Sequence, residues 1–257
     1  MNYLLYPALA GLLVLPTALF AQTSTFSQRV GADTYVSSGQ PNVNFGSQGA
    51  MEIAVPTAAQ PRTQIALLRF DTAAMQASFD TNYGAGNWAV TGVTLSLFSN
   101  FPLAGVQPGN ASFNKIAAGG FEFDLLSNNT WSETTLTWNT LPAILPAANN
   151  SNTLTPLGNF FWDAAGAGSS TWTLAAGAPL ADAIAAGTQV TILGQPTAGS
   201  TVGYLFNTLP SNPGYMNVTV AAVPEPSILG TLVAGTALII WHRRKKTRPA
   251  SFCPSSW

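Results

Sequence analysis

Residues 93–98, VTLSLF, alternate apolar and polar side chains along a short run. In a β-strand every second side chain lies on the same face, so this alternation predicts one face on a core and one in water. Residues 215–220, YMNVTV, repeat the pattern. Both runs predict antiparallel strands that are half buried. The residues expected to face the core are Val93, Leu95, Leu97, Met216, Val218 and Val220.

The residues around these runs extend the same prediction. Residues 65–70, IALLRF, are apolar on both faces and indicate a central strand. Turn-forming stretches such as NYGAGN and LPSNPG recur between the runs. Residues 179–187, PLADAIAAG, are the single helix candidate, whereas residues 141–170 look like a long loop. The fold class is therefore all-β, an antiparallel β-sandwich over residues 22–222.

Charged residues are scarce, at 7% of the chain against ~25% in an average soluble domain. Residues 22–222 hold four cations and nine carboxylates, so this body is mildly acidic. A body with so few cations is a poor ligand for a phosphate backbone, and we exclude nucleic acid as a partner.

Cys253 and His242 are the only cysteine and histidine of the chain, and both lie near its C-terminal end. Residues 22–222 therefore contain no disulfide, no Cys or His metal site and no Ser/His or Cys/His nucleophile pair. Any chemistry there would rest on carboxylates, Tyr, Lys or Ser, and no motif marks a catalytic residue. We therefore expect no enzymatic activity.

The chain starts with an apolar run, YLLYPALAGLLVLPTALFA at residues 3–21, followed by polar residues. This order is typical of a secretory signal peptide, so we expect residues 1–21 to form an export helix that is removed after Ala21. The alternative is a buried first strand or helix. Export would place the body outside the inner membrane.

Near the other end, residues 227–241 carry no charge. At 1.5 Å per helical residue they would cover ~22 Å, short of the ~30 Å hydrocarbon core, so a spanning helix would need local membrane thinning or interfacial ends. The basic cluster after this run predicts a cytoplasmic end. Its residues are Arg243, Arg244, Lys245 and Lys246.

The order of Pro224, Glu225 and Pro226, an apolar helix and a basic cluster resembles the PEP-CTERM sorting signal of bacteria that secrete exopolysaccharide. The resemblance implies that an exosortase recognises the Pro-Glu-Pro element, cleaves near it and passes the protein to the cell surface. Residues 223–248 would form this signal, and residues 249–257 a C-terminal extension that the family normally lacks. The alternative is an ordinary membrane anchor.

A second resemblance covers residues 31–220. The stretches GADTYVSSGQPNVNFGSQGAMEIAV, RTQIALLRFD, VTGVTLSLF, NNTWSETTLTWNTLP and VGYLFNTLPSNPGYMNVTV follow in order the pattern of DNRLRE (disaggregatase-related) domains. These are similar to jelly-roll carbohydrate-binding modules. The resemblance implies a jelly-roll-like β-sandwich that binds polysaccharide.

Trp131 and Trp138 lie seven residues apart in a Thr-rich run that looks like a strand. With a period of two they would face opposite sides, so one could stack on a sugar while the other packs in the core. Glu133 between them could bind sugar hydroxyls or calcium, although we favour a hydrogen bond to a backbone N–H. These three residues are the candidate ligand-binding site.

We expect structural roles for three further polar residues. Arg69 and Asp71 share one face of a predicted strand, and a buried guanidinium needs a carboxylate, so we expect Arg69 to pair with Asp71 or another acid. Asp33 begins the first predicted strand and could ligate a structural Ca²⁺, but a lone acid leaves the metal content unknown. We expect no other cofactor.

The favoured function is an exported, surface-sorted protein that binds or integrates into extracellular polysaccharide. Its partners would be the exosortase, the polysaccharide and, before processing, the inner membrane. One alternative is a structural surface or biofilm-matrix protein without sugar binding. Another is a polysaccharide-degrading enzyme, which would need paired carboxylates across a groove.

Overall fold

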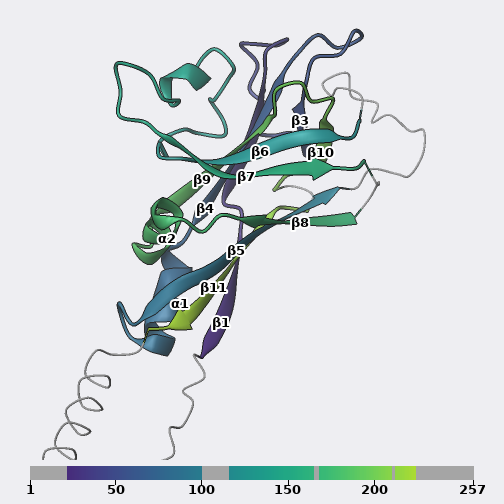
Figure 1. Ribbon diagram of the computed structural model, residues 1–257. Helices are drawn as coiled ribbons and strands as arrows, with labels where there is room; N and C mark the ends of the chain where they lie inside the picture. Colours follow the sequence, from purple (N-terminus) through teal and green to yellow (C-terminus); the bar gives the residue numbers. More distant parts are fainter. Residues whose placement is uncertain (1–21, 100–115, 165–167, 210–211, 224–257) are drawn as a thin grey trace, which may run out of the picture.

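The computed structural model describes residues 22–99, 116–164, 168–209 and 212–223. Eleven strands, two α-helices and one 3₁₀-helix lie within these ranges (Figure 1). The strands are β1 (Thr23–Arg29), β2 (Ala32–Ser37), β3 (Ala50–Ala54), β4 (Gln64–Asp71), β5 (Trp88–Ser99), β6 (Gly119–Leu126), β7 (Leu154–Trp162), β8 (Gly168–Leu174), β9 (Gln189–Pro196), β10 (Gly203–Asn207) and β11 (Tyr215–Ala222). The helices are α1 (Ala73–Tyr83), α2 (Ala178–Ala185) and the 3₁₀-helix η1 (Leu141–Ala143).

The strands form two sheets. One has four strands in the order β1-β11-β5-β8, and the other has seven, in the order β10-β3-β4-β9-β6-β7 with β2 paired to β4. All the strand pairs in both sheets are antiparallel. The predicted antiparallel β-sandwich is confirmed.

The main core lies between the two sheets. The alternation in VTLSLF and YMNVTV is confirmed, because the six residues expected to face inward are at most 1% exposed. They pack in one cluster with the inner side chains of the seven-stranded sheet, among them Leu68, Phe70, Phe121 and Phe123. Apolar burial between the sheets is the main stabilising contribution to such a fold.

Strand β4 is buried on both faces, as its sequence IALLRF predicts. Ala66, Leu68 and Phe70 point into the main core, whereas Ile65 and Leu67 belong to a second apolar cluster on the outer face of the sheet. Residues 127–153, which connect β6 to β7, pack over this second cluster and are called the covering segment below. Their buried members are Trp131, Leu136, Leu141 and Ile144.

Two helices pack against the main core, and their buried residues belong to the same apolar cluster as the inner side chains of the sheets. The predicted helix at residues 179–187 is confirmed as α2, and Gly187 follows it at a φ of 62°, which glycine adopts without strain. Helix α1 was not predicted, so the expectation of a single helix is wrong. Its alanine-rich sequence has no apolar stripe beyond Met75 and Phe79, which are both buried.

The expectation of a loop over residues 141–170 is also wrong in part. Leu154–Trp162 form β7, which pairs with β6 along its length, and Gly168 begins β8. Pro156 and Gly158 interrupt the strand pattern of β7 in the sequence. In the structure, the pairing of β7 with β6 shifts register between Phe123 and Asp124. Proline and glycine are unusual inside a strand and mark irregular pairing here.

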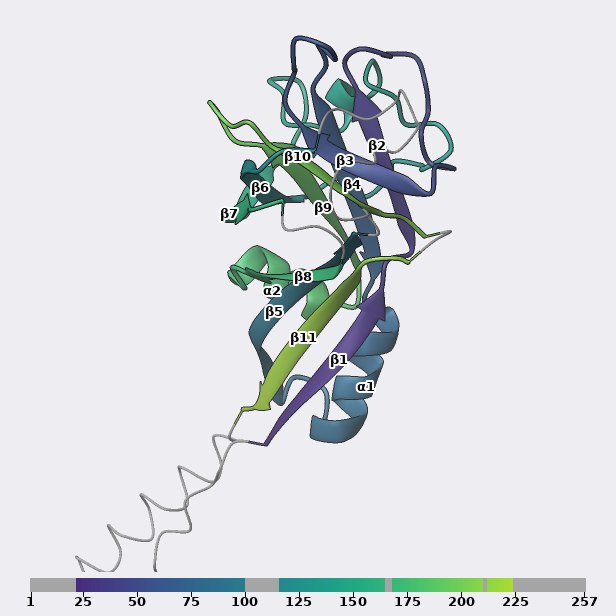
Figure 2. The ribbon, with the colours of Figure 1, turned by 90° about the vertical axis from the view of Figure 1, so that its right-hand side faces the viewer.

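The first and last described strands are neighbours. Thr23 of β1 pairs with Ala221 of β11, so the two ends of the sandwich meet at one edge (Figure 2). Among the residues that the structure describes, none of the helices has the length and apolar character needed to cross a membrane. The predicted export segment 1–21 and sorting helix 227–241 lie outside the described residues.

Candidate functional site

Trp131 is a structural residue rather than a platform for a ligand. It is 4% exposed, it packs in the second cluster, and its Nε1 donates a hydrogen bond of 3.0 Å to Thr191 Oγ1. The Thr-rich run around it is a series of turns, so the prediction of a strand with opposite faces is wrong. The hydroxyls explain this: Ser132 Oγ accepts the Thr134 N–H, and Thr137 and Thr140 exchange similar bonds, which favours turns over a ladder.

Trp138 packs against the same cluster but stays half buried. Of the two tryptophans, it is the one that keeps ring surface for a ligand. Trp131 and Trp138 therefore differ in exposure, although both belong to the covering segment of one cluster rather than to two faces of a strand.

Arg69 holds the covering segment to the sheet. Its Nη1 donates to the carbonyl oxygens of Asn129 at 3.0 Å and Trp131 at 2.6 Å, and its guanidinium carbon lies 4.8 Å from the centroid of the Trp131 ring. The expected structural role is present, but among the described residues the hydrogen bonds of Arg69 go to carbonyl oxygens and not to Asp71 or another acid, and Asp71 accepts the Ala73 N–H at the start of α1. Carbonyl oxygens and the indole face stabilise the cation in place of an acid.

Glu133 joins the covering segment to the start of β2, since its Oε2 accepts the backbone N–H of Asp33 at 3.2 Å. This is the hydrogen bond that we favoured from the sequence. The residue also lies against Asn44, whose Nδ2 donates to the carbonyls of Glu133 at 2.7 Å and Leu136 at 2.8 Å. Gly46 packs so closely on the Glu133 backbone that a Cβ there would collide with the Glu133 carbonyl oxygen.

A further pair of contacts links the same two stretches. Asn139 donates its backbone N–H to the Pro41 carbonyl at 3.0 Å and its Nδ2 to Asn42 Oδ1 at 2.7 Å. Residues 41–46 and 131–139 are thus held together by hydrogen bonds, although about 90 residues separate them in the sequence. We call this set of contacts the clasp. The resemblance to DNRLRE domains rests in part on these stretches. In the structure, their hydrogen bonds connect two parts of the chain beside the second cluster.

Asp33 is a buried carboxyl group, 1% exposed. Its Oδ2 accepts the Leu209 N–H at 2.8 Å, while its Oδ1 has no hydrogen-bond partner among the described residues. Burial, with a smaller contribution from the nearby Glu133 carboxylate, raises the pKa of Asp33 from 3.8 to about 7, against the lowering effects of the Leu209 N–H and Arg29. The described residues form no group of three or more His, Cys, Asp or Glu side chains around a common point, so calcium at Asp33 stays a prediction.

A second acidic pair lies on the outer face of β6. Gln195 of β9 donates from its Nε2 to Glu122 Oε1 at 2.8 Å and to Asp124 Oδ2 at 3.1 Å. Burial raises the pKa of Asp124, and the neighbouring Glu122 adds to the effect. The sequence analysis did not single out these two carboxylates.

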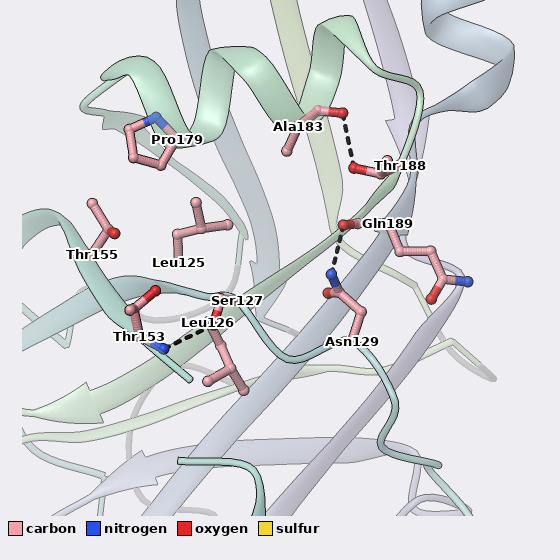
Figure 3. Close-up of a pocket in the computed structure, with 10 residues that line it drawn as sticks. All are labelled: Leu125, Leu126, Ser127, Asn129, Thr153, Thr155, Pro179, Ala183, Thr188 and Gln189. Atoms are coloured by element: carbon pink, nitrogen blue, oxygen red, sulfur yellow. Dashed lines mark hydrogen bonds between the residues drawn. The ribbon is translucent and has the colours of Figure 1, made fainter. Parts of the chain in front are cut away.

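A surface pocket of about 230 Å³ lies between α2 and the C-terminal half of β6 (Figure 3). Leu125 points into its centre, and Pro179 and Ala183 of α2 form an apolar wall. Hydroxyl and amide side chains surround this apolar part. They are Ser127, Asn129, Thr153, Thr155 and Thr188, with Gln189 at the edge.

The sequence analysis missed this pocket because three separate stretches of the chain form it. Residues 125–129, 153–155 and 179–189 meet only through the pairing of β6 with β7 and β9. The signal available was weak: the polar runs SNNT at residues 127–130 and SNTLT at residues 151–155 both look like ordinary loops. The predicted sorting residues, by contrast, lie outside the described residues, as does the basic cluster.

The described residues thus form an antiparallel β-sandwich with a surface pocket lined by hydroxyl and amide groups. The family model for carbohydrate-binding module family 96 matches residues 24–166, more than half of the chain, and the chain belongs to this family. None of the curated proteins matches it. Strands β8 to β11 and helix α2 lie beyond the matched residues, but they complete both sheets and one wall of the pocket.

Proposed function

We propose that the protein is an exported, surface-sorted module that binds extracellular polysaccharide without cleaving it. The observation that carries the proposal is the membership of carbohydrate-binding module family 96. Carbohydrate-binding modules are non-catalytic domains, which fits a sequence without a recognisable catalytic motif. The antiparallel sandwich gives such a module a rigid framework for a polar binding surface.

The polarity of the body supports binding to a sugar chain. With few charged side chains, its surface hydrogen-bonding groups are mainly Asn, Gln, Ser and Thr. Amides and hydroxyls can donate and accept, as sugar hydroxyls do, so they match such a ligand without burying an unpaired charge. The pocket beside α2 collects groups of this kind over an apolar floor.

Sorting is supported by the Pro-Glu-Pro resemblance and by the position of the sandwich ends. Residues 22 and 223 both continue into segments that we expect to be recognised at the membrane, and their strands pair at one edge. None of the residues that line the pocket belongs to β1 or β11, so attachment at this edge leaves the pocket open to a ligand. The exosortase would act on residues 224–226 and release or transfer the domain to the surface.

Two alternatives remain distinct from this proposal. A purely structural matrix protein would show no saturable sugar binding. A degrading enzyme would use a carboxylate pair, and Glu122 with Asp124 is a pair available on β6. Gln195 bonds to both of these carboxylates and thereby satisfies part of their hydrogen-bonding capacity, which fits a structural role better than an acid and base separated by a substrate.

The test is co-sedimentation of the full-length protein with the insoluble exopolysaccharide of the bacterium that produces it. We expect saturable retention that survives extensive washing, and no new reducing ends in the supernatant. Retention that does not saturate, or that heat-denatured protein reproduces, would contradict the binding proposal. Release of reducing ends that Glu122→Gln or Asp124→Asn abolishes would favour the enzyme.

A further inference from the structure

The first and last described residues lie together at one end of the sandwich. The N–H of Ala222 donates to the Gln22 carbonyl at 3.0 Å, and the N–H of Val223 donates to the Asn87 carbonyl at 2.8 Å. Asn87 belongs to the loop that connects α1 to β5. We call this end of the sandwich the base (Figure 2). It consists of residues 22, 23, 84–87, 222 and 223.

The hydrogen-bonded backbone continues almost to the predicted membrane segment. Val223 is held to the base, and only residues 224–226 separate it from the apolar run that begins at Ser227. The four backbone steps from Val223 to Ser227 reach at most ~14 Å, and the headgroup layer on each side of a membrane takes up ~5–8 Å. The reach that remains is less than the ~10–12 Å diameter of an α-helix. If residues 227–241 span the membrane, as the sorting proposal requires, the base lies on the headgroups or just above them.

The N-terminal end of the sandwich adds a second tether before processing. The expected export helix ends at Ala21, and the next residue, Gln22, already accepts the Ala222 N–H. Two tethers that reach the membrane from one point restrict how far the sandwich can move away from it. Both ends of the chain therefore place the same surface towards the lipid.

The part of the sandwich around the base is almost free of charge. Residues 22–28, 72–99 and 212–223, which include β11, α1, β5 and most of β1, contain no Lys, Arg or His and one carboxylate, Asp80. Asp80 Oδ1 accepts a hydrogen bond of 2.8 Å from Trp88 Nε1. The other eight of the nine carboxylates of the body lie elsewhere in the sequence. Anionic lipids repel carboxylates, so this end can approach a membrane at little electrostatic cost.

The base has little affinity of its own for lipid. Val223 is its one exposed large hydrophobic side chain, at 43%, and the loop beside it contains Gly84, Ala85 and Gly86. Binding of a protein surface to a membrane increases with buried apolar area and with basic charge, and the base offers little of either. The short tether, rather than affinity, therefore determines whether the base stays on the membrane.

We propose that the base of the sandwich rests on the lipid headgroups of the inner membrane, held there by residues 224–226, until the sorting signal is cut. The inference rests on the proposed sorting and adds the surface that meets the membrane. Cleavage near Pro224 and Pro226 would take place directly beside the loop 84–87. The same cut would end the contact, because the tether is what maintains it.

The experiment places the full-length protein in vesicles of phosphatidylethanolamine and phosphatidylglycerol, with and without lipids that carry a nitroxide on the headgroup. Ala85→Cys, in a Cys253→Ser background, carries an environment-sensitive fluorophore on the base. Ala58→Cys, in the same background, is the matched control, because Ala58 is exposed on the loop between β3 and β4 at the opposite end of the sandwich (Figure 2). A third protein combines Ala85→Cys with about ten Gly and Ser residues inserted after Val223, a linker with an r.m.s. length of ~17 Å.

We expect all three proteins to float with the vesicles in a density gradient. The nitroxide lipid should quench most of the emission of the Ala85→Cys protein and little of the emission of the Ala58→Cys protein. The inserted linker should lower the quenching at residue 85 to the level of the Ala58→Cys control, without releasing the protein from the vesicles.

Equal quenching at the two labelled residues, in protein that floats with the vesicles, would overturn the inference and leave the sorting proposal standing. Quenching that the linker leaves unchanged would overturn the role of the tether. Quenching at Ala85→Cys that appears only when inner-membrane proteins are added would assign the base to a protein partner instead of lipid. Protein that does not float with the vesicles at all would instead contradict the membrane segment, and with it the proposed sorting.

Discussion

The guanidinium of Arg69 lies over the indole ring of Trp131, 4.8 Å from its centroid, while its Nη1 donates to the Trp131 carbonyl. One side chain of β4 thus holds both the ring and the backbone of the segment that covers the outer face of the sheet. The same Nη1 donates to the Asn129 carbonyl, so this contact also helps to fix the rim of the pocket. Core packing and the candidate site are coupled through these residues.

This coupling predicts non-additive effects on stability. Trp131→Ala should lower the free energy of unfolding by ~3–5 kcal/mol, as for other large aromatic truncations in a core. Arg69→Lys should cost ~1–3 kcal/mol, because an ammonium group cannot reproduce both carbonyl bonds and the stacking. Denaturant unfolding of both single variants and the double variant measures the coupling, and we expect the double variant to lose less than the sum.

Trp138→Ala is the matched control for Trp131. Because Trp138 is only partly buried, we expect a loss of ~1–2 kcal/mol. Equal losses for the two tryptophans, or strict additivity of Arg69→Lys and Trp131→Ala, would contradict the packing described here.

Gly46 tests the clasp between residues 41–46 and the covering segment. Gly46→Ala should destabilise the protein by ~1–3 kcal/mol or more, because its Cβ meets the Glu133 carbonyl oxygen and the backbone has to shift. Gly92→Ala is the control, since a Cβ there makes only an ordinary contact with Thr219. Thermal unfolding compares the two, and a Gly46→Ala variant as stable as Gly92→Ala would show that the clasp is loose.

The sequence predicted the sandwich because strand periodicity is a local signal: the inward residues of VTLSLF and YMNVTV are all buried. The expected difference in exposure between Trp131 and Trp138 is present, but the strand predicted to cause it was wrong, because hydroxyl-to-backbone bonds at Ser132 and Thr140 fold the run into turns, which strand periodicity cannot reveal. Helix α1 lacks an apolar stripe, and the pocket depends on strand pairing between distant residues. Such features follow from tertiary contacts that no single window of sequence contains.

Asp33 predicts a pH dependence of stability. Its pKa is raised to about 7 in the folded state from 3.8, so the folded state binds the proton more tightly than the unfolded state. The resulting stabilisation is complete below the unfolded pKa and is lost as the pH rises towards 7, at up to ~1.4 kcal/mol per pH unit. Asp33→Asn keeps an acceptor for the Leu209 N–H and removes this charge beside Glu133.

We therefore expect the stability advantage of Asp33→Asn over the wild type to grow between about pH 4 and about pH 7 and to level off above pH 7, as measured by urea unfolding. Other titrating groups are shared by both proteins and cancel in the difference. An advantage that stays constant would contradict the buried, proton-binding Asp33. A melting temperature that EDTA lowers in the wild type alone would show that calcium, and not a proton, accompanies this carboxylate.

Export and sorting predict a processed protein at the cell surface. We expect intact-mass spectrometry of the surface fraction to show loss of residues before about Gln22 and of the predicted C-terminal helix. Substituting Glu225 by Gln should leave export unchanged but retain the protein at the inner membrane. Recovery of the full-length chain from the cytosol alone would end the sorting proposal.

Binding without cleavage is the claim on which the proposed function depends, and calorimetric titration of the full-length protein with the producer's soluble exopolysaccharide measures it. We predict a saturable heat of binding, and no increase in reducing ends during the titration. Heats that equal those of dilution across the accessible range of polysaccharide concentration would contradict polysaccharide binding, and a steady rise in reducing ends would contradict a non-catalytic module.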